Sequence, residues 1–190
     1  CAGISWYDAV LFCNRRSRYA GLDTVYSFLQ AESTLAGRIY NLVDLKIHYE
    51  KNGFRLPTES EWEYAARGGM ETLFYWGDSM DVEAAEEYAW FSCNSEGKTW
   101  PVGKKIPNVY GLYDMAGNVM EWTGGWKGEY RDTGIVDYVG PRKEGAQKER
   151  VVRGGSFNLS LEYCRHSARN TPYTTLPSSA TDYIGFRCVV

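Results

Sequence analysis

The chain has 190 residues, a formal net charge of −3 and 44% hydrophobic residues. This length suits one domain with a sizeable core, and the slight acidic surplus argues against nucleic acid as the main partner. No apolar run approaches the roughly 20 residues that a membrane-spanning helix needs, so we expect no direct membrane span.

The cysteine and histidine content argues against a zinc site. Only two histidines occur, and no two cysteines form a C-x-x-C pair. The odd number of cysteines leaves the redox compartment open, since one disulfide and buried free thiols both fit. The chain starts at Cys1, which could be read as an acylated lipoprotein terminus. We expect a trimmed chain instead, because a core helix already begins near residue 5.

The first predicted element is a helix from Ser5 to Arg18. Ser5 and Asp8 have the spacing of a capping box, and Gly21 follows as a stop signal. One side of this helix is apolar, with Trp6, Ala9, Val10 and Cys13. A short strand is expected next, at Val25–Phe28.

The sharpest local pattern is the run GFRLPTESEWEYAARGG at residues 53–69. Thr58 and Glu61 form a second capping box, and Arg67 followed by Gly68 is typical of a helix end. Trp62, Ala65 and Ala66 supply the buried stripe. The glutamates at the helix start (Glu59, Glu61 and Glu63) are explained by capping and by the helix dipole rather than by acid–base catalysis.

Beyond this helix the chain is rich in glycine and aromatic residues, with short apolar runs and frequent turn residues. No internal repeat or low-complexity linker indicates a second domain. We therefore predict a single α+β domain over 1–190, with two helices and short, irregular antiparallel strands. The tryptophans assigned to its core are Trp62, Trp90, Trp100 and Trp122.

Three segments carry a family resemblance. They are the 53–69 run, the run PNVYGLYDMAGNVMEWT at 107–123, and a C-terminal segment that opens with VRGGSF at 152–157 and closes with IGFR at 184–187. Together they resemble the formylglycine-generating-enzyme (sulfatase-modifying-factor) family, which has a variant C-type lectin fold. Members usually carry further N-terminal strands before the first helix.

The resemblance implies an enzyme whose copper is held by two thiolates, a pair that suits Cu(I). In this sequence the matching positions are Leu159 and Cys164, so one thiol is absent. A related iron-dependent branch of the family needs a histidine-rich site, which His48 and His166 alone cannot supply. We therefore predict no copper and no catalytic residues.

Calcium is the cofactor that the resemblance leaves in place. Asp114, Gly117, Val119 and Glu121 match calcium-binding positions of the family's enzyme, through two carboxylates and two backbone carbonyls. The alternative is that Asp114 and Glu121 hold a turn and pair with an arginine without metal. We expect a structural calcium ion at these four residues.

The segment 157–183 has a restricted composition. It contains no Lys, Gln, Met or Trp and one Glu, at Glu162. Substitution of the adenines in an Asn codon never yields these five residue types. The segment thus resembles the variable region of a diversity-generating retroelement, although an ordinary polar loop is the alternative.

This resemblance predicts an exposed ligand-binding face, anchored by fixed ends at Arg153–Ser156 and Gly185–Arg187. Tyrosines would give it contact area and Ser and Thr adaptable hydrogen bonds, as in antibody paratopes. Four arginines (Arg153, Arg165, Arg169 and Arg187) are assigned to internal bonds of the scaffold. The predicted face comprises Phe157, Asn158, Leu159, Ser160, Tyr163, His166, Tyr173, Thr174, Thr175, Ser178, Ser179, Thr181, Asp182 and Tyr183.

The sequence therefore predicts a non-catalytic, receptor-like binding protein at the cell surface or outside the cell. Its partner is expected to be a protein or another cell-surface molecule. The alternatives are a degenerate enzyme-family domain with a regulatory or structural role, and an active copper-dependent cysteine oxidase.

Overall fold

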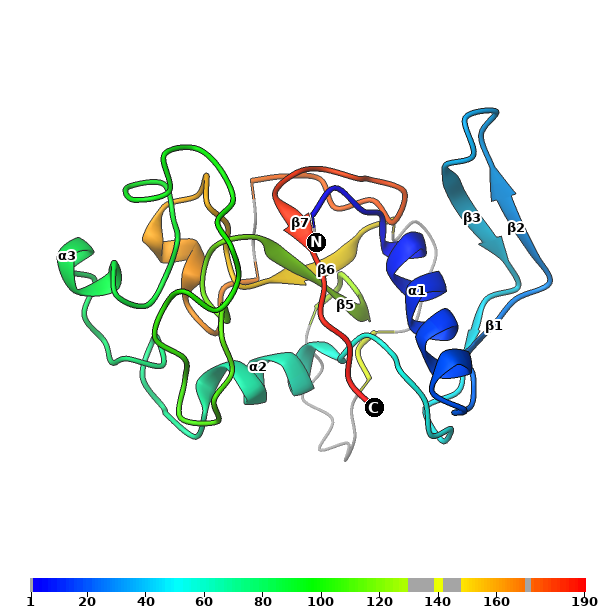
Figure 1. Cartoon of the computed structure of the whole chain (residues 1–190), viewed down its shortest axis with the longest axis horizontal. Coiled ribbons are helices and arrows are strands. Elements are labelled where there is room, and N and C mark those ends of the chain that lie inside the picture. The colour runs from blue at the N-terminus through cyan, green and yellow to red at the C-terminus, as the bar shows by residue number, and fades with distance from the viewer. Residues whose placement is uncertain (1, 130–138, 142–147, 170–171) are drawn as a thin grey trace.

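The computed structural model describes residues 2–129, 139–141, 148–169 and 172–190 (Figure 1). In the N-terminal half, helix α1 is followed by two strand pairs and helix α2. The C-terminal half is mostly loop around one short sheet. The elements are α1 (Trp6–Tyr19), β1 (Tyr26–Ser27), β2 (Gln30–Ser33), β3 (Ile39–Val43), β4 (Lys46–Ile47), α2 (Glu59–Arg67), α3 (Val82–Ala85), β5 (Met120–Trp126), β6 (Arg150–Arg153), the 3-10 turn η1 (Leu161–Cys164) and β7 (Ile184–Gly185).

Both predicted helices form where their caps indicate. The Ser5 hydroxyl accepts the Asp8 amide, while the Asp8 carboxylate accepts the Ser5 amide, which completes the first capping box. The same reciprocal pair joins Thr58 and Glu61 at the start of α2, and Gly68 ends that helix in a left-handed conformation. These bonds satisfy backbone N–H groups that the first helical turn leaves unpaired.

The central sheet has the order β6-β5-β7. Strands β5 and β6 are antiparallel, with Glu121 opposite Arg153, whereas β5 and β7 are parallel, with Met120 opposite Ile184. The prediction of antiparallel strands alone is therefore wrong for β7. The chain also forms a helical turn that was not predicted, α3, capped by the Asp81 side chain.

Two buried clusters fill the fold. The first packs α1 against the sheet through Trp6, Val10 and Trp122. The second packs α2 against the loops at the opposite end of the molecule and contains Trp62 and Phe91 (Figure 1).

The prediction for the four tryptophans is right for Trp62 and Trp122, which are buried. Trp90 and Trp100 are only half-buried and stack on each other with ring centroids 4.6 Å apart. Lysine side chains cover the two rings: Lys105 lies over Trp90 and Lys98 over Trp100.

Candidate binding face and its anchors

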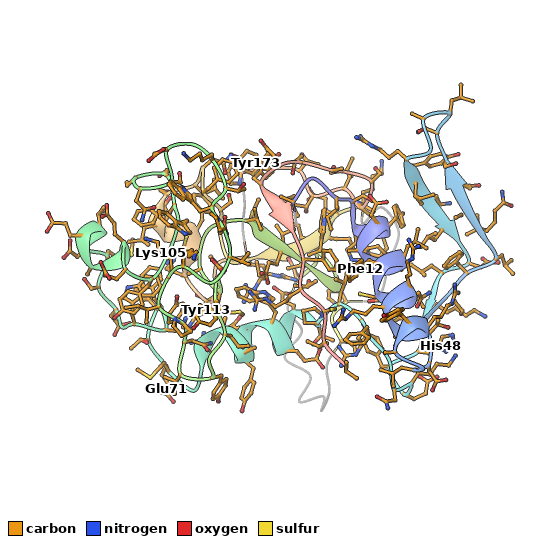
Figure 2. The ribbon with its side chains drawn as sticks, viewed as in Figure 1. Phe12, His48, Glu71, Lys105, Tyr113 and Tyr173 are labelled. Atoms are coloured by element: carbon orange, nitrogen blue, oxygen red, sulfur yellow. The ribbon has the colours of Figure 1, made fainter. Side chains whose placement is uncertain are left out.

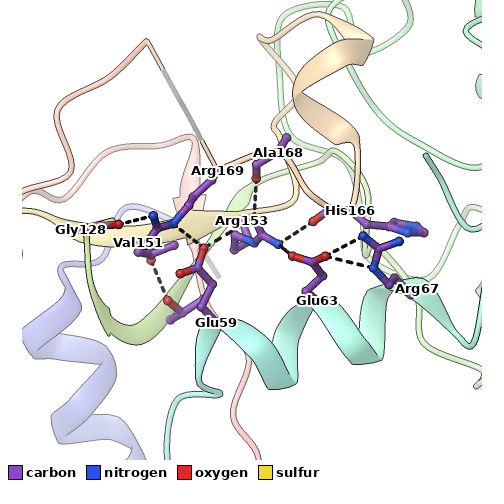
Figure 3. Close-up of polar contacts among 10 residues, drawn as sticks. Glu59, Glu63, Arg67, Gly128, Val151, Arg153, His166, Ala168 and Arg169 are labelled. Carbon is purple, nitrogen blue, oxygen red and sulfur yellow. Dashed lines mark hydrogen bonds and ion pairs between the residues drawn. The ribbon is translucent and has the colours of Figure 1, made fainter. Parts of the chain in front are cut away.

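The first fixed end of the 157–183 segment is held by Arg153, whose side chain is fully buried (Figure 3). Its guanidinium donates to the carbonyls of His166 (2.7 Å) and Ala168 (3.0 Å) and pairs with the Glu63 carboxylate. Glu63 in turn pairs with Arg67 on the same helix. Arg153 thus joins the loop after η1 to α2.

A second arginine extends this network along α2 (Figure 3). The Arg169 Nε donates to Glu59 at 2.7 Å, and its Nη1 donates to the Gly128 carbonyl. The carboxylates of Glu59 and Glu63 therefore bind arginines of the C-terminal half, a role that capping and the helix dipole do not describe. Of the three glutamates, Glu61 has the predicted capping role.

The second fixed end is held by Arg187. Its Nε and Nη2 donate to the two carboxylate oxygens of Glu121, at 2.6 and 2.8 Å. The indole N–H of Trp62 donates to the same carboxylate at 2.7 Å. The prediction of internal bonds is confirmed for Arg153, Arg169 and Arg187, which form ion pairs with glutamates. Arg165 also makes an internal hydrogen bond, to the Glu162 carbonyl, and is partly exposed.

Residues outside the segment hold its backbone at several points. The Phe157 amide donates to the Asn118 carbonyl, and the Ser92 amide donates to the Leu159 carbonyl. Farther along, the Trp6 amide donates to the Pro177 carbonyl and the Met120 amide donates to the Tyr183 carbonyl. These are backbone bonds, so they do not depend on which side chains the segment carries.

The exposure of the predicted face residues divides them into three groups. Asn158, Ser160, Thr174 and Asp182 are exposed. Tyr163, Tyr173, Ser178, Ser179, Thr181 and Tyr183 are half-buried. The third group is buried, contrary to the prediction, and comprises Phe157, Leu159, His166 and Thr175.

Each buried residue has a packing or bonding reason. Phe157 and Leu159 are apolar side chains in the interior, next to the backbone bonds described above. His166 lies parallel to the Tyr75 ring, with centroids 6.3 Å apart, and was wrongly expected at the surface. The Thr175 hydroxyl donates to the Arg150 carbonyl at 2.7 Å.

The fold brings residues far apart in the segment into one cluster. Tyr173 and Tyr183 stack with ring centroids 4.3 Å apart, and the Asn158 side-chain amide donates to the Tyr173 hydroxyl at 3.1 Å. Burial raises the pKa of Tyr173, as do the neighbouring Tyr183 and Asp182. Tyr173 lies at an edge of the molecule remote from α2 (Figure 2). We call Asn158, Tyr173, Asp182 and Tyr183 the tyrosine cluster.

Tyr163 lies in a separate hollow of about 280 Å³, together with Arg165, Ser167 and Arg169. Sequence reasoning assigned Arg165 to the scaffold and did not include Ser167. Their place in the hollow depends on the path of the loop after η1, for which the sequence has no local signal.

The copper-binding positions do not fit Cu(I). Leu159 contributes no ligand, and the Cys164 thiol is fully buried, where burial raises its pKa to about 12. A side chain at Gly155 would place its Cβ 2.7 Å from the Cys164 sulfur, so this thiol packs tightly against backbone. Within the described residues, no three His, Cys, Asp or Glu side chains gather as metal ligands.

The calcium-binding positions are only partly taken up by protein groups. Both Glu121 oxygens bind the Arg187 cation, and Asp114 Oδ2 accepts the Gly103 amide at 2.7 Å, whereas Asp114 Oδ1 is buried without a hydrogen-bond partner among the described residues. Gly117 is needed for a different reason, because a Cβ there would come within 2.1 Å of the Trp90 carbonyl oxygen. Val119 could contribute to a calcium site only through its backbone carbonyl. The arrangement matches the arginine alternative at Glu121, and calcium stays a prediction.

Comparison with known proteins agrees with this architecture. The chain is 36% identical to the formylglycine-generating enzyme of Mus musculus over 147 residues, covering 72% of this chain and 39% of the mouse protein. It therefore spans about two fifths of that relative's length. No described helix combines the length and apolarity needed to span a bilayer.

Two solved structures are similar. Treponema denticola variable protein 1 superposes with a TM-score of 0.79 at 34% identity, covering 98% of this chain and 69% of that one. CarF superposes with a TM-score of 0.68 at 26% identity, covering 98% of this chain and 66% of its own. The whole chain, residues 1–190, matches the family described as the sulfatase-modifying factor enzyme 1-like domain, and we conclude that it belongs to that family.

Proposed function

We propose that this chain is a non-catalytic binding protein that presents a variable, tyrosine-rich face on a fixed scaffold. The observation that carries the proposal is that, within residues 157–183, the backbone is bonded to the rest of the fold while several side chains remain accessible. Backbone bonds to Asn118, Ser92, Trp6 and Met120 fix the path of the segment. In the tyrosine cluster, Asn158 and Asp182 are exposed, and the stacked Tyr173 and Tyr183 rest on the first core cluster while part of each side chain stays accessible. Side chains on such a path can change without loss of the fold.

The chemistry of the cluster suits recognition. Tyr173 and Tyr183 offer large, rigid surfaces at low entropic cost, and Asn158 with Asp182 adds polar groups beside them. The composition of the segment supports diversification by adenine substitution, and the similarity to a Treponema variable protein supports the same function. A partner protein or another cell-surface molecule is the ligand class, and display at the cell surface or outside the cell is the corresponding location.

Two other functions fit less well. An active copper oxidase lacks one thiol at Leu159 and has the other sealed in the core at Cys164. A degenerate regulatory module would need neither the restricted composition of the segment nor a partly exposed tyrosine cluster.

A pair of libraries tests the proposal. The first randomises exposed or half-buried positions of the face (158, 160, 173, 174, 182 and 183). The second, matched control randomises the buried positions 157, 159, 166 and 175. We expect most members of the first library to unfold cooperatively near the parent temperature and some to bind an arbitrary target such as hen lysozyme. Most members of the control should fail to fold.

The genome supplies an independent test. A reverse transcriptase gene and a template repeat should lie near this gene, with adenines in the codons for positions 158, 173 and 183. A template repeat without adenines at those codons would contradict the proposal, as would a first library that folds no better than its control.

A further inference from the structure

Arg150 on β6 is a buried cation without an anionic partner. Its residue exposure is 3%, and its Nη1 donates to the Gly124 carbonyl at 2.8 Å. The Nε is sealed from solvent and has no acceptor, and no carboxylate of the described residues lies within ion-pair distance of the guanidinium. Arg153, Arg169 and Arg187 each bind a glutamate.

Two indole rings partly compensate this charge. The Arg150 guanidinium carbon lies 3.7 Å from the ring centroid of Trp6 and 3.5 Å from that of Trp126. Desolvated cation–π contacts offset only part of the free-energy cost of burying an unpaired ion. Burial lowers the pKa of Arg150, which reflects the hydration that the guanidinium has lost. A bound anion would supply the missing charge.

Arg150 lines a cavity of about 500 Å³, which is in the range of small-ligand sites. Tyr7, Tyr49 and Trp126 form aromatic walls, and Gly124 and Gly125 leave room beside them. Among the described residues, the one atom that a Cβ at Gly125 would meet within 4 Å is the Val139 carbonyl oxygen, at 3.8 Å. Asp44 also lines the cavity but makes no ion pair with Arg150. The cavity shares no residue with the proposed binding face.

We propose that this cavity binds a carboxylate group beside Arg150. A planar carboxylate matches the geometry of a guanidinium, which presents its N–H donors as a rigid fork. The Tyr7 and Tyr49 phenols add donors at the cavity wall, and the Trp126 ring covers the apolar part of a ligand. The carboxylate can belong to a free organic acid or to an acidic side chain of a polypeptide, and the experiment distinguishes these two sources.

The test titrates the 190-residue chain with two acids and their uncharged counterparts. Glucuronate is compared with glucose, and the blocked peptide acetyl-Gly-Glu-Gly-amide with its Gln analogue. Tryptophan fluorescence reports on Trp6 and Trp126, and amide chemical shifts report on Gly124 and Gly125. We expect saturable changes with one acid and none with its neutral counterpart. Binding of glucuronate alone identifies an organic acid, and binding of the peptide alone identifies a polypeptide side chain.

Variants locate the binding. Gly125→Val fills the cavity while Arg150 is retained, and it should weaken binding at least tenfold. Arg150→Met removes the cation, although it also removes two ring contacts and so risks the fold. Arg18→Gln, a change on the exposed end of α1, is the matched control and should bind as the parent does. The proposal is overturned if neither acid saturates, or if a folded Gly125→Val variant binds either acid as tightly as the parent.

Discussion

Arg187 holds Glu121 by two parallel hydrogen bonds, Nε to Oε2 at 2.6 Å and Nη2 to Oε1 at 2.8 Å. The pair connects the C-terminal strand region to β5, and Trp62 of α2 donates to the same carboxylate. Strand β5, helix α2 and the segment after β7 therefore meet at one buried carboxylate.

Loss of Arg187 should destabilise the fold. Arg187→Ala leaves the Glu121 carboxylate buried and unpaired, and removing one partner of such a pair typically costs roughly 3–5 kcal/mol. Urea denaturation measures the change. Arg165→Ala is the control, because Arg165 is partly exposed and donates to the carbonyl of Glu162 without pairing with a charge among the described residues, so the expected loss is under about 1 kcal/mol. Equal losses in the two variants would contradict the anchoring role of Arg187.

The same pair makes a prediction about calcium. If calcium binds at Asp114 and Glu121, chelation should lower the melting temperature and Asp114→Asn should weaken that dependence. The arginine alternative, in which Arg187 already neutralises Glu121, predicts the same melting temperature with a chelator and with millimolar calcium. A ligand that binds only the native state would raise it. A chelator-induced fall in the melting temperature that Asp114→Asn abolishes would establish the calcium site instead.

Truncation of the tyrosine cluster should spare the fold. The stacked Tyr173 and Tyr183 pair is half-buried, so the triple change of Tyr173, Thr174 and Tyr183 to alanine removes a contact worth about 1 kcal/mol beyond lost area. Trp122→Ala, in the core, should cost about 3–5 kcal/mol. Thermal unfolding compares the two. The face would be structural if the triple variant were as unstable as Trp122→Ala.

His166 should make stability depend on pH. Its burial lowers its pKa from 6.5 to about 4, with Arg67 adding to the effect, so the folded state resists a proton that the unfolded state accepts. The stabilisation is complete above pH 6.5 and is lost as the pH falls toward 4. Between pH 7 and pH 5 the loss is about 2 kcal/mol.

His166→Phe is the control for this pH dependence. It keeps a ring beside Tyr75, and neither ring nitrogen of His166 has a hydrogen-bond partner to lose. Its urea midpoint should change less between pH 7 and pH 5 than that of the parent. Identical pH profiles would show that another group is responsible.

The oxidase alternative predicts aldehyde formation, and we expect none. With Leu159 at one copper position, the chain incubated with Cu(I), oxygen and a sulfatase-type cysteine peptide should leave the peptide unchanged by mass spectrometry. Leu159→Cys restores the second thiol and should raise the affinity for Cu(I). Aldehyde produced by the parent chain would refute the non-catalytic function.

The sequence by itself determined where the two main helices, α1 and α2, begin. Ser5 with Asp8 and Thr58 with Glu61 are three residues apart, so their capping bonds form within one helical turn and depend on nothing else. The family motifs likewise determined the fold class. The restricted composition of 157–183 marked the segment in which the tyrosine cluster lies.

Tertiary structure decided which side chains of that segment face solvent. His166 and Thr175 are polar, like their exposed neighbours, so composition predicts that they are exposed as well. In the fold they are buried, His166 beside Tyr75 and Thr175 against the Arg150 carbonyl. The Met120 amide of β5 donates to the Tyr183 carbonyl, and β7, which follows Tyr183, pairs with β5 in parallel. These backbone contacts fix the position at which Tyr183 meets Tyr173. Such pairings depend on the path of the chain between distant residues, so no periodicity or spacing in the sequence specifies them.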